Sequence, residues 1–338
     1  MQTKSNKFKN GHVVVTGGSG AIGSRLVRRL LKEPLDRLVV IDDFSSGSRW
    51  LLPGDPRLVV VDADVNSLPD LALEVQNPIV FHLAALFANQ NSVDHPLEDL
   101  RVNGAGTLQA LLWSQQQRAR RFVYASAGCS VAGHDIEGPI HEHLPPSLHH
   151  HTPYQVTKLL GELYCNYFSR QLSTVRCRFF NAFGPGEVPG SYRNVIPNFF
   201  WEALHGRPLE ITGTGEETRD FVFVDDLVEG LVLAATVAEA DGLALNLGTG
   251  QPTRIIDLAE AINTLCGSHS DIRITKRRHW DHSSHRCADI SLARKVLGFA
   301  PRTDFNSGLE QTAAWFDQNR MSITRTIDGR RAGPGSHV

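Results

Sequence analysis

The chain has 338 residues, a length that suggests two domains or one large domain with a cap. Its apolar fraction of 41%, its charged fraction of 21% and its formal net charge of −2 are ordinary for a soluble globular protein. The balanced charge gives no sign of a nucleic-acid partner, and no apolar run reaches the roughly 18 residues that a membrane span needs.

The cysteines indicate the compartment. They are five, an odd number, and none are spaced as CxxC, which favours reduced thiols over a disulfide framework or a zinc site. The apolar run that follows the N-terminal lysines is short and ends in glycines, so we do not interpret it as a signal peptide. We therefore expect a cytoplasmic protein that binds neither nucleic acid nor membrane.

The first predicted element is a buried strand over residues 12–16 that turns directly into a helix. Leu26, Val27 and Leu30 recur at helical spacing, and three glycines occupy the turn. Glycines at such a turn permit close approach of a ligand, and the helix N-terminus offers N–H groups to a pyrophosphate. The residues that we expect to contact a dinucleotide here are Gly17, Gly20, Ala21, Ile22 and Gly23.

A second strand, residues 37–43, ends in Asp42 and Asp43, about 20 residues after the glycines. A carboxylate at this position accepts a hydrogen bond from an adenosine ribose hydroxyl and repels a 2′-phosphate, which favours NAD over NADP. The alternative is a strand-end Asp that caps the turn 44–47, and the nearby Arg49 weakens the argument for NAD slightly.

The third and fourth strands, residues 57–65 and 78–85, each end in residues suited to a dinucleotide. An adenine could lie at the end of the third, and small alanines at the end of the fourth would let the ligand lie against the backbone. These residues are Asp64, Val65, Leu83, Ala84 and Ala85. A helix from Asn103 to about Gln117 and a fifth strand, residues 121–126, follow. The alternation predicts a doubly wound parallel sheet with ligands at the carboxyl ends of its strands.

Residues 127–151 form a predicted loop with six histidines. Acidic partners are few, and His141 and His143 share one side only in an extended chain. We therefore expect a solvated or lid-like loop and no metal site.

The next predicted helix starts at Pro153 and carries Tyr154 and Lys158 four residues apart, on one face. A free tyrosine titrates near pH ~10, and a nearby lysine ammonium favours the phenolate. Such a pair could take a proton from a sugar hydroxyl while hydride leaves the same carbon.

Together these motifs resemble the extended short-chain dehydrogenases/reductases, and more narrowly the NAD-dependent epimerase/dehydratase family that acts on nucleotide sugars. The resemblance covers roughly residues 11–318. It implies a Rossmann domain over residues 1–180 and a smaller α/β domain over 181–322 that mainly binds the nucleotide sugar, with some strands returning to the sheet. The polar tail, residues 323–338, is expected to be disordered.

The resemblance also implies roles for residues that the local pattern leaves open. Asn103, Tyr154, Lys158 and Phe180 would contact NAD. Asn181 would contact the sugar nucleotide, and the helix that includes Val195 would cover the uracil. Arg219 and Arg278 would bind the diphosphate, because a guanidinium forms bidentate hydrogen bonds with phosphate.

The sequence departs from the family after the fifth strand. A catalytic Ser or Thr is usual there, but the aligned position falls on Ala127 or Gly128. Ser126, Cys129 or Ser130 could replace it, and Ser126 is narrowly preferred. The loop also lacks the Asp-Glu pair of the 4,6-dehydratases and the nearby Glu of the uronate decarboxylases, which argues against both branches.

The resemblance therefore implies a nucleotide-sugar 4-epimerase that acts on a UDP-hexose, UDP-hexosamine or UDP-hexuronate through a 4-keto intermediate, with Tyr154 as base. The alternatives are a UDP-glucuronate decarboxylase or another 4-keto-forming dehydratase, and a non-catalytic NAD-sensing module. Family members commonly pair through two long helices, so a homodimer through residues 100–117 and 153–170 is expected.

Overall fold

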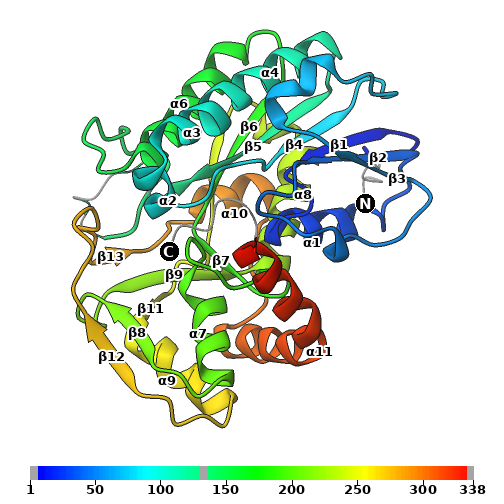
Figure 1. Ribbon diagram of the computed structural model, residues 1–338. Helices are drawn as coiled ribbons and strands as arrows, with labels where there is room; N and C mark the ends of the chain where they lie inside the picture. The colour runs from blue at the N-terminus through cyan, green and yellow to red at the C-terminus, as the bar shows by residue number, and fades with distance from the viewer. Residues whose placement is uncertain (1–6, 129–131, 133–135, 137, 333–338) are drawn as a thin grey trace.

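Seven parallel strands form the central sheet of the computed structural model, which describes residues 7–128, 132, 136 and 138–332. The strand order is β10-β6-β5-β4-β1-β2-β3 (Figure 1). The strands are β1 (His12–Thr16), β2 (Arg37–Asp42), β3 (Leu58–Asp62), β4 (Ile79–His82), β5 (Arg121–Ala127), β6 (Thr174–Phe179) and β10 (Ala244–Leu247).

Helices cover both faces of this sheet (Figure 1). Val13 and Val15 of β1 pack in one apolar cluster with α1 (Ala21–Leu30) and α8 (Val224–Thr236). Val14, between them, packs in another cluster with α4 (Gly106–Gln116) and α6 (Pro153–Phe168). Because successive strand residues point to opposite faces, the continuous apolar runs follow from burial on both sides. The prediction of a doubly wound parallel sheet is confirmed.

The smaller half of the molecule is built from residues of the C-terminal part of the chain. Phe199, Phe221 and Phe316 belong to its apolar cluster. Its strands are β7 (Asn181–Phe183), β8 (Leu209–Thr212), β9 (Thr218–Phe223), β11 (Pro252–Arg254), β12 (Ile272–Thr275) and β13 (His285–Arg286). Its helices are α7 (Val195–Leu204), α9 (Ile255–Leu265) and α11 (Phe305–Ala332).

The remaining elements are short and connect the two halves or cover the sheet. They are η1 (Arg49–Leu51), η2 (Val65–Asp70), α2 (Asn89–Asp94), α3 (Pro96–Asp99), η3 (Leu100–Ala105), η4 (Ala238–Ala240) and α10 (Ser291–Leu297). Within the described ranges, no helix combines the length and apolarity needed to cross a membrane.

The structure corrects the expectation of a disordered tail from residue 323. Helix α11 continues to Ala332, the side chain of Ile323 is fully buried, and Trp50 Nε1 donates a hydrogen bond to Thr326 Oγ1 at 3.0 Å. The tail is polar overall, but the apolar contacts of Ile323 and Ile327 and the hydrogen bonds of Thr326 and Arg330 hold it against the rest of the molecule. Residues 333–338 lie outside the described part of the chain.

Candidate active site

A cavity of about 600 Å³ lies at the carboxyl ends of the central strands and extends to α7 and β9 of the smaller half. Both halves of the chain therefore contribute to one site. The predicted site residues that line the cavity are Gly17, Gly20, Ala21, Ile22, Gly23, Asp42, Asp43, Asp64, Val65, Leu83, Ala84, Ala85, Ser126, Tyr154, Lys158, Phe180, Asn181, Val195, Arg219 and Arg278.

Asn103 is the predicted site residue that the structure places behind the cavity wall. Its buried amide accepts a hydrogen bond from Leu86 N at 2.9 Å and donates to Leu86 O at 3.1 Å. It also donates to Asp99 Oδ1 at 2.7 Å. Since Leu86 lines the cavity, these hydrogen bonds of Asn103 hold part of the cavity wall in place.

The glycine turn after β1 has the geometry of a diphosphate cradle. Gly17 has φ +70, and a Cβ atom there would lie 2.6 Å from Ala84 N, so no larger residue fits. Helix α1 starts after Gly20, which has no side chain to cap it. The N–H groups of the first turn therefore remain available to an anion, and the residues present fit the diphosphate of a dinucleotide.

Asp42 organises the same region. Its Oδ2 accepts a hydrogen bond from Ser19 N at 2.8 Å, and its Oδ1 accepts one from Phe44 N at 2.9 Å. The carboxylate thus caps the turn after β2, as the alternative interpretation expected. Each oxygen keeps a further lone pair, so the capping role is compatible with accepting a ribose hydroxyl.

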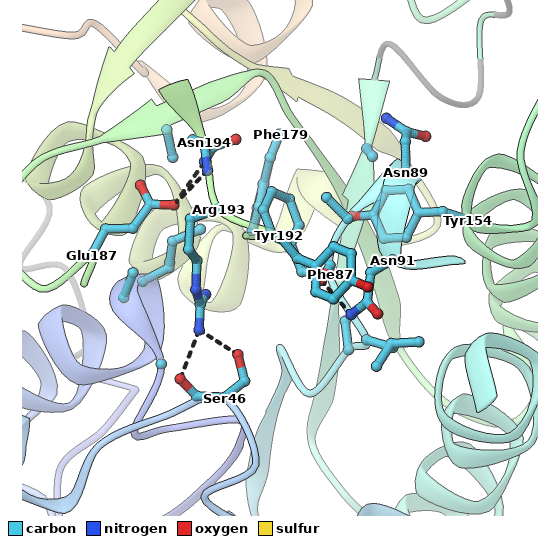
Figure 2. A pocket seen from close by; sticks show the side chains of 18 of the residues that line it. Ser46, Phe87, Asn89, Asn91, Tyr154, Phe179, Glu187, Tyr192, Arg193 and Asn194 are labelled. Carbon is cyan, nitrogen blue, oxygen red and sulfur yellow. Dashed lines mark hydrogen bonds between the residues drawn. The ribbon is translucent and has the colours of Figure 1, made fainter. Parts of the chain in front are cut away.

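Tyr154 and Lys158 lie on the buried face of α6, where both side chains reach the cavity. Lys158 Nζ donates a hydrogen bond to Ala125 O at 2.9 Å and lies 5.6 Å from the centre of the Tyr154 ring. Burial lowers the pKa of Lys158 to about 8, a shift that the nearby Asp99 carboxylate opposes. The ring of Phe87 packs edge-on against Tyr154 (Figure 2).

Ser126 also lines the cavity, but its hydroxyl is engaged with a buried ion pair. It donates to Glu162 Oε1 at 2.5 Å, and Arg178 donates to both oxygens of Glu162 at 2.8 Å. The Ser126 proton therefore points to Glu162 in this arrangement. The alternatives, Cys129 and Ser130, lie outside the described residues.

Two arginines meet one carboxylate at the other end of the cavity. Arg219 and Arg286 are neighbours in the pairing of β9 with β13. The guanidinium of Arg219 lies 3.4 Å from Asp281 Oδ2, and that of Arg286 lies 3.8 Å from Asp281 Oδ1. The sequence indicated Arg219, but the place of Asp281 between the two arginines depends on a strand pairing that no local pattern shows.

The resemblance placed residues 192–194 in the segment that covers the uracil, but sequence reasoning missed the cavity residues of α2 and of the segment just before it. Tyr192 donates from its hydroxyl to Asp94 Oδ2 at 3.0 Å, and Trp280 Nε1 donates to Gln90 Oε1 at 2.8 Å. Figure 2 shows the missed residues Phe87, Asn89 and Asn91 near Tyr154, and Glu187 beside the expected residues Arg193 and Asn194. Their only sequence signal is proximity to strand ends or to α7.

In the histidine-rich segment, His141 Nδ1 lies 2.8 Å from Asp289 Oδ2. Among the residues that the structure describes, no three His, Cys, Asp or Glu side chains are grouped so that they could hold a metal ion.

Comparison with known proteins places these features in a family. A model of the NAD dependent epimerase/dehydratase family matches residues 13–248. A UDP-glucose 4-epimerase from Mycolicibacterium smegmatis is 34% identical over 311 residues, which cover 90% of this chain and 97% of the relative.

Solved structures agree with that match. The epimerase Mth375 from Methanothermobacter thermautotrophicus superposes with a TM-score of 0.92 at 44% identity, covering 95% of this chain and 96% of that one. The Bordetella bronchiseptica enzyme WbmF in complex with NAD+ and UDP superposes with a TM-score of 0.83 at 33% identity, covering 97% and 98%. The similarity thus extends over both halves of the chain.

Proposed function

The chain belongs to the NAD dependent epimerase/dehydratase family, and we propose that it is a nucleotide-sugar 4-epimerase whose substrate is a UDP-sugar. The observation that carries the proposal is that one cavity is lined by the glycine turn, by Tyr154 with Lys158, and by Arg219. A coenzyme site, a base and a diphosphate-binding cation are the parts that such a reaction needs.

NAD fits the glycine turn and the start of α1, with Asp42 at the adenosine ribose. When bound there, NAD supplies a reversible hydride acceptor for the sugar C4. Ala84 and Ala85 form a wall of small side chains beside it. We assign the other predicted coenzyme contacts, Asp43, Asp64, Val65, Leu83 and Phe180, to the same site because they line the same cavity.

Tyr154 is the proposed base. Its phenolate accepts the proton of the sugar 4-hydroxyl and later returns it to the 4-oxygen. The ammonium group of Lys158 favours the phenolate through its charge, and its hydrogen bond to Ala125 O holds it in place. Inversion at C4 requires the 4-keto sugar to turn about its diphosphate linkage, so that the hydride returns to its other face. The same two side chains then serve both directions, and no second substrate is needed.

The substrate's nucleotide lies, in this proposal, between α7 and β9. Asn181 and Val195 line that part of the cavity, and Arg219 and Arg278 provide positive charge for the diphosphate. Asp281 pairs with Arg219, which keeps the guanidinium oriented before an anion arrives. The relatives named above support uridine as the base, since one acts on UDP-glucose and another is in complex with UDP.

Ser126 remains the proposed hydrogen-bond donor to the sugar 4-oxygen. Its hydroxyl would have to turn its proton from Glu162 toward the sugar, since Glu162 accepts that proton in the structure. A serine hydroxyl rotates readily and also offers lone pairs, so binding of a sugar with its own donors can change the direction of the bond.

The test is a mixed pool of UDP-hexoses, UDP-hexosamines and UDP-hexuronates analysed by mass spectrometry and by separation of epimers. We expect a product of unchanged mass for one sugar class. Tyr154→Phe should abolish this conversion, by at least about 10²-fold, because it removes the base, yet should retain NAD. Tyr167→Phe is the matched control: it changes an exposed tyrosine of the same helix and should be fully active.

Other outcomes would identify the alternatives. Loss of carbon dioxide from a hexuronate would indicate a decarboxylase instead of an epimerase. Bound NAD without conversion of any sugar would favour a binding module, and full activity of Tyr154→Phe would contradict the role of this residue as base.

We also propose that the protein is a homodimer. Several large apolar side chains are exposed on α3, η3 and α6, which contact one another in the fold. They are Leu97, Leu100, Val156, Leu163 and Tyr167. Exposed apolar side chains gathered on neighbouring elements are typical of an interface, and the family resemblance makes a second copy the proposed occupant.

A cytoplasmic location is proposed on the state of the cysteines. Cys165, Cys177 and Cys266 are free, and burial raises the pKa of the Cys165 and Cys177 thiols above the ordinary range. Free thiols of this kind are typical of a reducing compartment.

A further inference from the structure

The loop after β2 forms part of the wall of the NAD site. Ser45, Ser46 and Gly47 line the cavity directly after Asp42 and Asp43. Ser48 N donates a hydrogen bond to Ser19 O at 3.0 Å, and a Cβ atom on Gly47 would lie 1.9 Å from Ser19 Oγ. The loop therefore lies directly on the glycine turn, so a movement of Ser46 changes the width of the coenzyme site.

Two arginines from the C-terminal part of the chain hold this loop. Arg193, just before α7, crosses the cavity and donates to Ser46 O at 2.7 Å and to Ser46 Oγ at 2.5 Å (Figure 2). Arg330, near the end of α11, donates to the same Ser46 O at 2.5 Å. We call Arg193, Arg330 and Ser46 the clasp.

Helix α11 holds the next part of the loop as well. The ring of Trp50 stacks on Trp315 with 6.0 Å between ring centres, and Trp50 Nε1 donates to Thr326 Oγ1. The β2–η1 segment is thus fixed at Ser46 and at Trp50 by one helix that begins in the smaller half. The loop can therefore move away from the cavity only when the hydrogen bonds of the clasp and the contacts of Trp50 both break.

The charges of the clasp favour an anionic ligand. Burial, together with the charge of Arg193, lowers the pKa of Arg330 to about 10. The described part of the chain places no carboxylate within ion-pair distance of either guanidinium, although Glu187 contributes a more distant negative charge to Arg193. Arg193 and Arg330 both donate to the uncharged carbonyl of Ser46, and their charges repel each other. A dianionic dinucleotide beside them reduces this repulsion.

We propose that the clasp retains NAD: Arg193 and Arg330 must release Ser46 before the coenzyme can leave. This inference rests on the proposed position of NAD at the glycine turn. Arg193 connects the segment before α7 with the loop after β2, which lie on opposite sides of the cavity. While its hydrogen bonds to Ser46 persist, these two segments cannot separate to release the coenzyme. Retention suits a reaction that ends with the coenzyme in its starting state, because exchange of NAD would serve no purpose in the cycle.

The experiment follows the loss of NAD from purified holoenzyme after dilution, with a dehydrogenase that consumes free NAD as the trap. Arg193→Ala and Arg330→Ala should each release NAD about tenfold faster than the unmodified protein, because each removes hydrogen bonds of a charged donor. The double variant should be faster than either. Ser46→Ala, which removes one exposed acceptor and leaves the backbone carbonyl, should show a smaller increase.

Arg320→Ala is the matched control on the same helix. Its guanidinium donates to Leu204 O and not to the loop, so NAD release should match that of the unmodified protein. Melting temperatures of the apo forms, measured in parallel, separate loss of the clasp from general loss of stability.

The readout needs no sugar, so a failure of the proposed epimerase activity leaves it valid. NAD release from the double variant at the rate of Arg320→Ala would overturn the clasp. An unmodified protein that retains no NAD would overturn it as well.

Discussion

Glu187 is a buried carboxylate on the cavity wall that the proposed reaction does not use. Its Oε1 accepts a hydrogen bond from Asn194 Nδ2 at 3.0 Å, and the positive charge of Arg193 favours the carboxylate. Burial nevertheless raises the pKa of Glu187 to about 7. The cost of removing the charge from water thus outweighs the contacts that the carboxylate makes.

This raised pKa predicts that Glu187 lowers the free energy of unfolding at high pH, and Glu187→Gln should remove that effect. The folded pKa lies above the ordinary value of 4.5, so the folded state holds a proton that the unfolded state loses. The stabilisation that comes from the higher proton affinity of folded Glu187 is fully present below pH 4.5, and it is lost as the pH rises through about 7. At pH 8 we expect the variant to be more stable than the unmodified protein, on the order of 2 kcal/mol, and at pH 4.5 to have little advantage.

Thermal or denaturant unfolding across pH 4.5 to 8 measures the effect. A difference between the two proteins that stays constant over this range would contradict a raised pKa. Glu98→Gln provides a control, because Glu98 pairs with Arg101 at the surface and its pKa is lowered instead.

Helix α6 presents a buried face to the cavity and an exposed apolar face on its opposite side. Tyr154, Lys158 and Glu162 are buried at intervals of four residues, and Val156, Leu163 and Tyr167 are exposed at intervals of seven and four. Both sets follow the helical period. Gly161 lets the buried face approach β5, since a Cβ atom there would lie 2.1 Å from the Tyr124 hydroxyl. The helix can therefore position the base and present an apolar surface at once.

The proposed homodimer predicts that Leu163→Glu yields monomers. Leu163 is 53% exposed, and a carboxylate from each copy would be forced out of water in the interface. Sedimentation velocity measures the mass. Met321→Glu is the control, because it alters an exposed apolar residue of α11, outside the α3–α6 surface. A monomeric unmodified protein, or an unchanged dimer of Leu163→Glu, would refute this interface.

At the scale of the whole molecule, α11 connects the two halves. It packs in the apolar cluster of the smaller half through Phe316 and Ile323, and it contacts the β2–η1 segment through Thr326 and Arg330. Figure 1 shows the helix, in orange and red, running from the smaller half toward α1. The C-terminal helix thus stabilises the smaller half and also holds the loop after β2, which lines the cavity.

Its contribution to stability can be measured at one position. Ile323→Ala should destabilise the protein by about 2–4 kcal/mol, because it creates a cavity at a fully buried site. Met321→Ala, two residues earlier and 75% exposed, should change the free energy of unfolding by less than about 0.5 kcal/mol. Equal, negligible effects of both substitutions on the melting temperature would restore the expectation of a disordered tail.

The amino-acid sequence by itself determined the sheet, the glycine turn and the shared face of Tyr154 and Lys158. Each depends on spacing within a few residues, which backbone geometry converts directly into a strand, a tight turn or a helix face. Only the tertiary structure decided that Arg193 and Arg330 meet at Ser46, that Asp281 lies between Arg219 and Arg286, and that Ser126 donates to Glu162. These residues are distant in the chain, and packing of whole elements, which no local period encodes, brings them together.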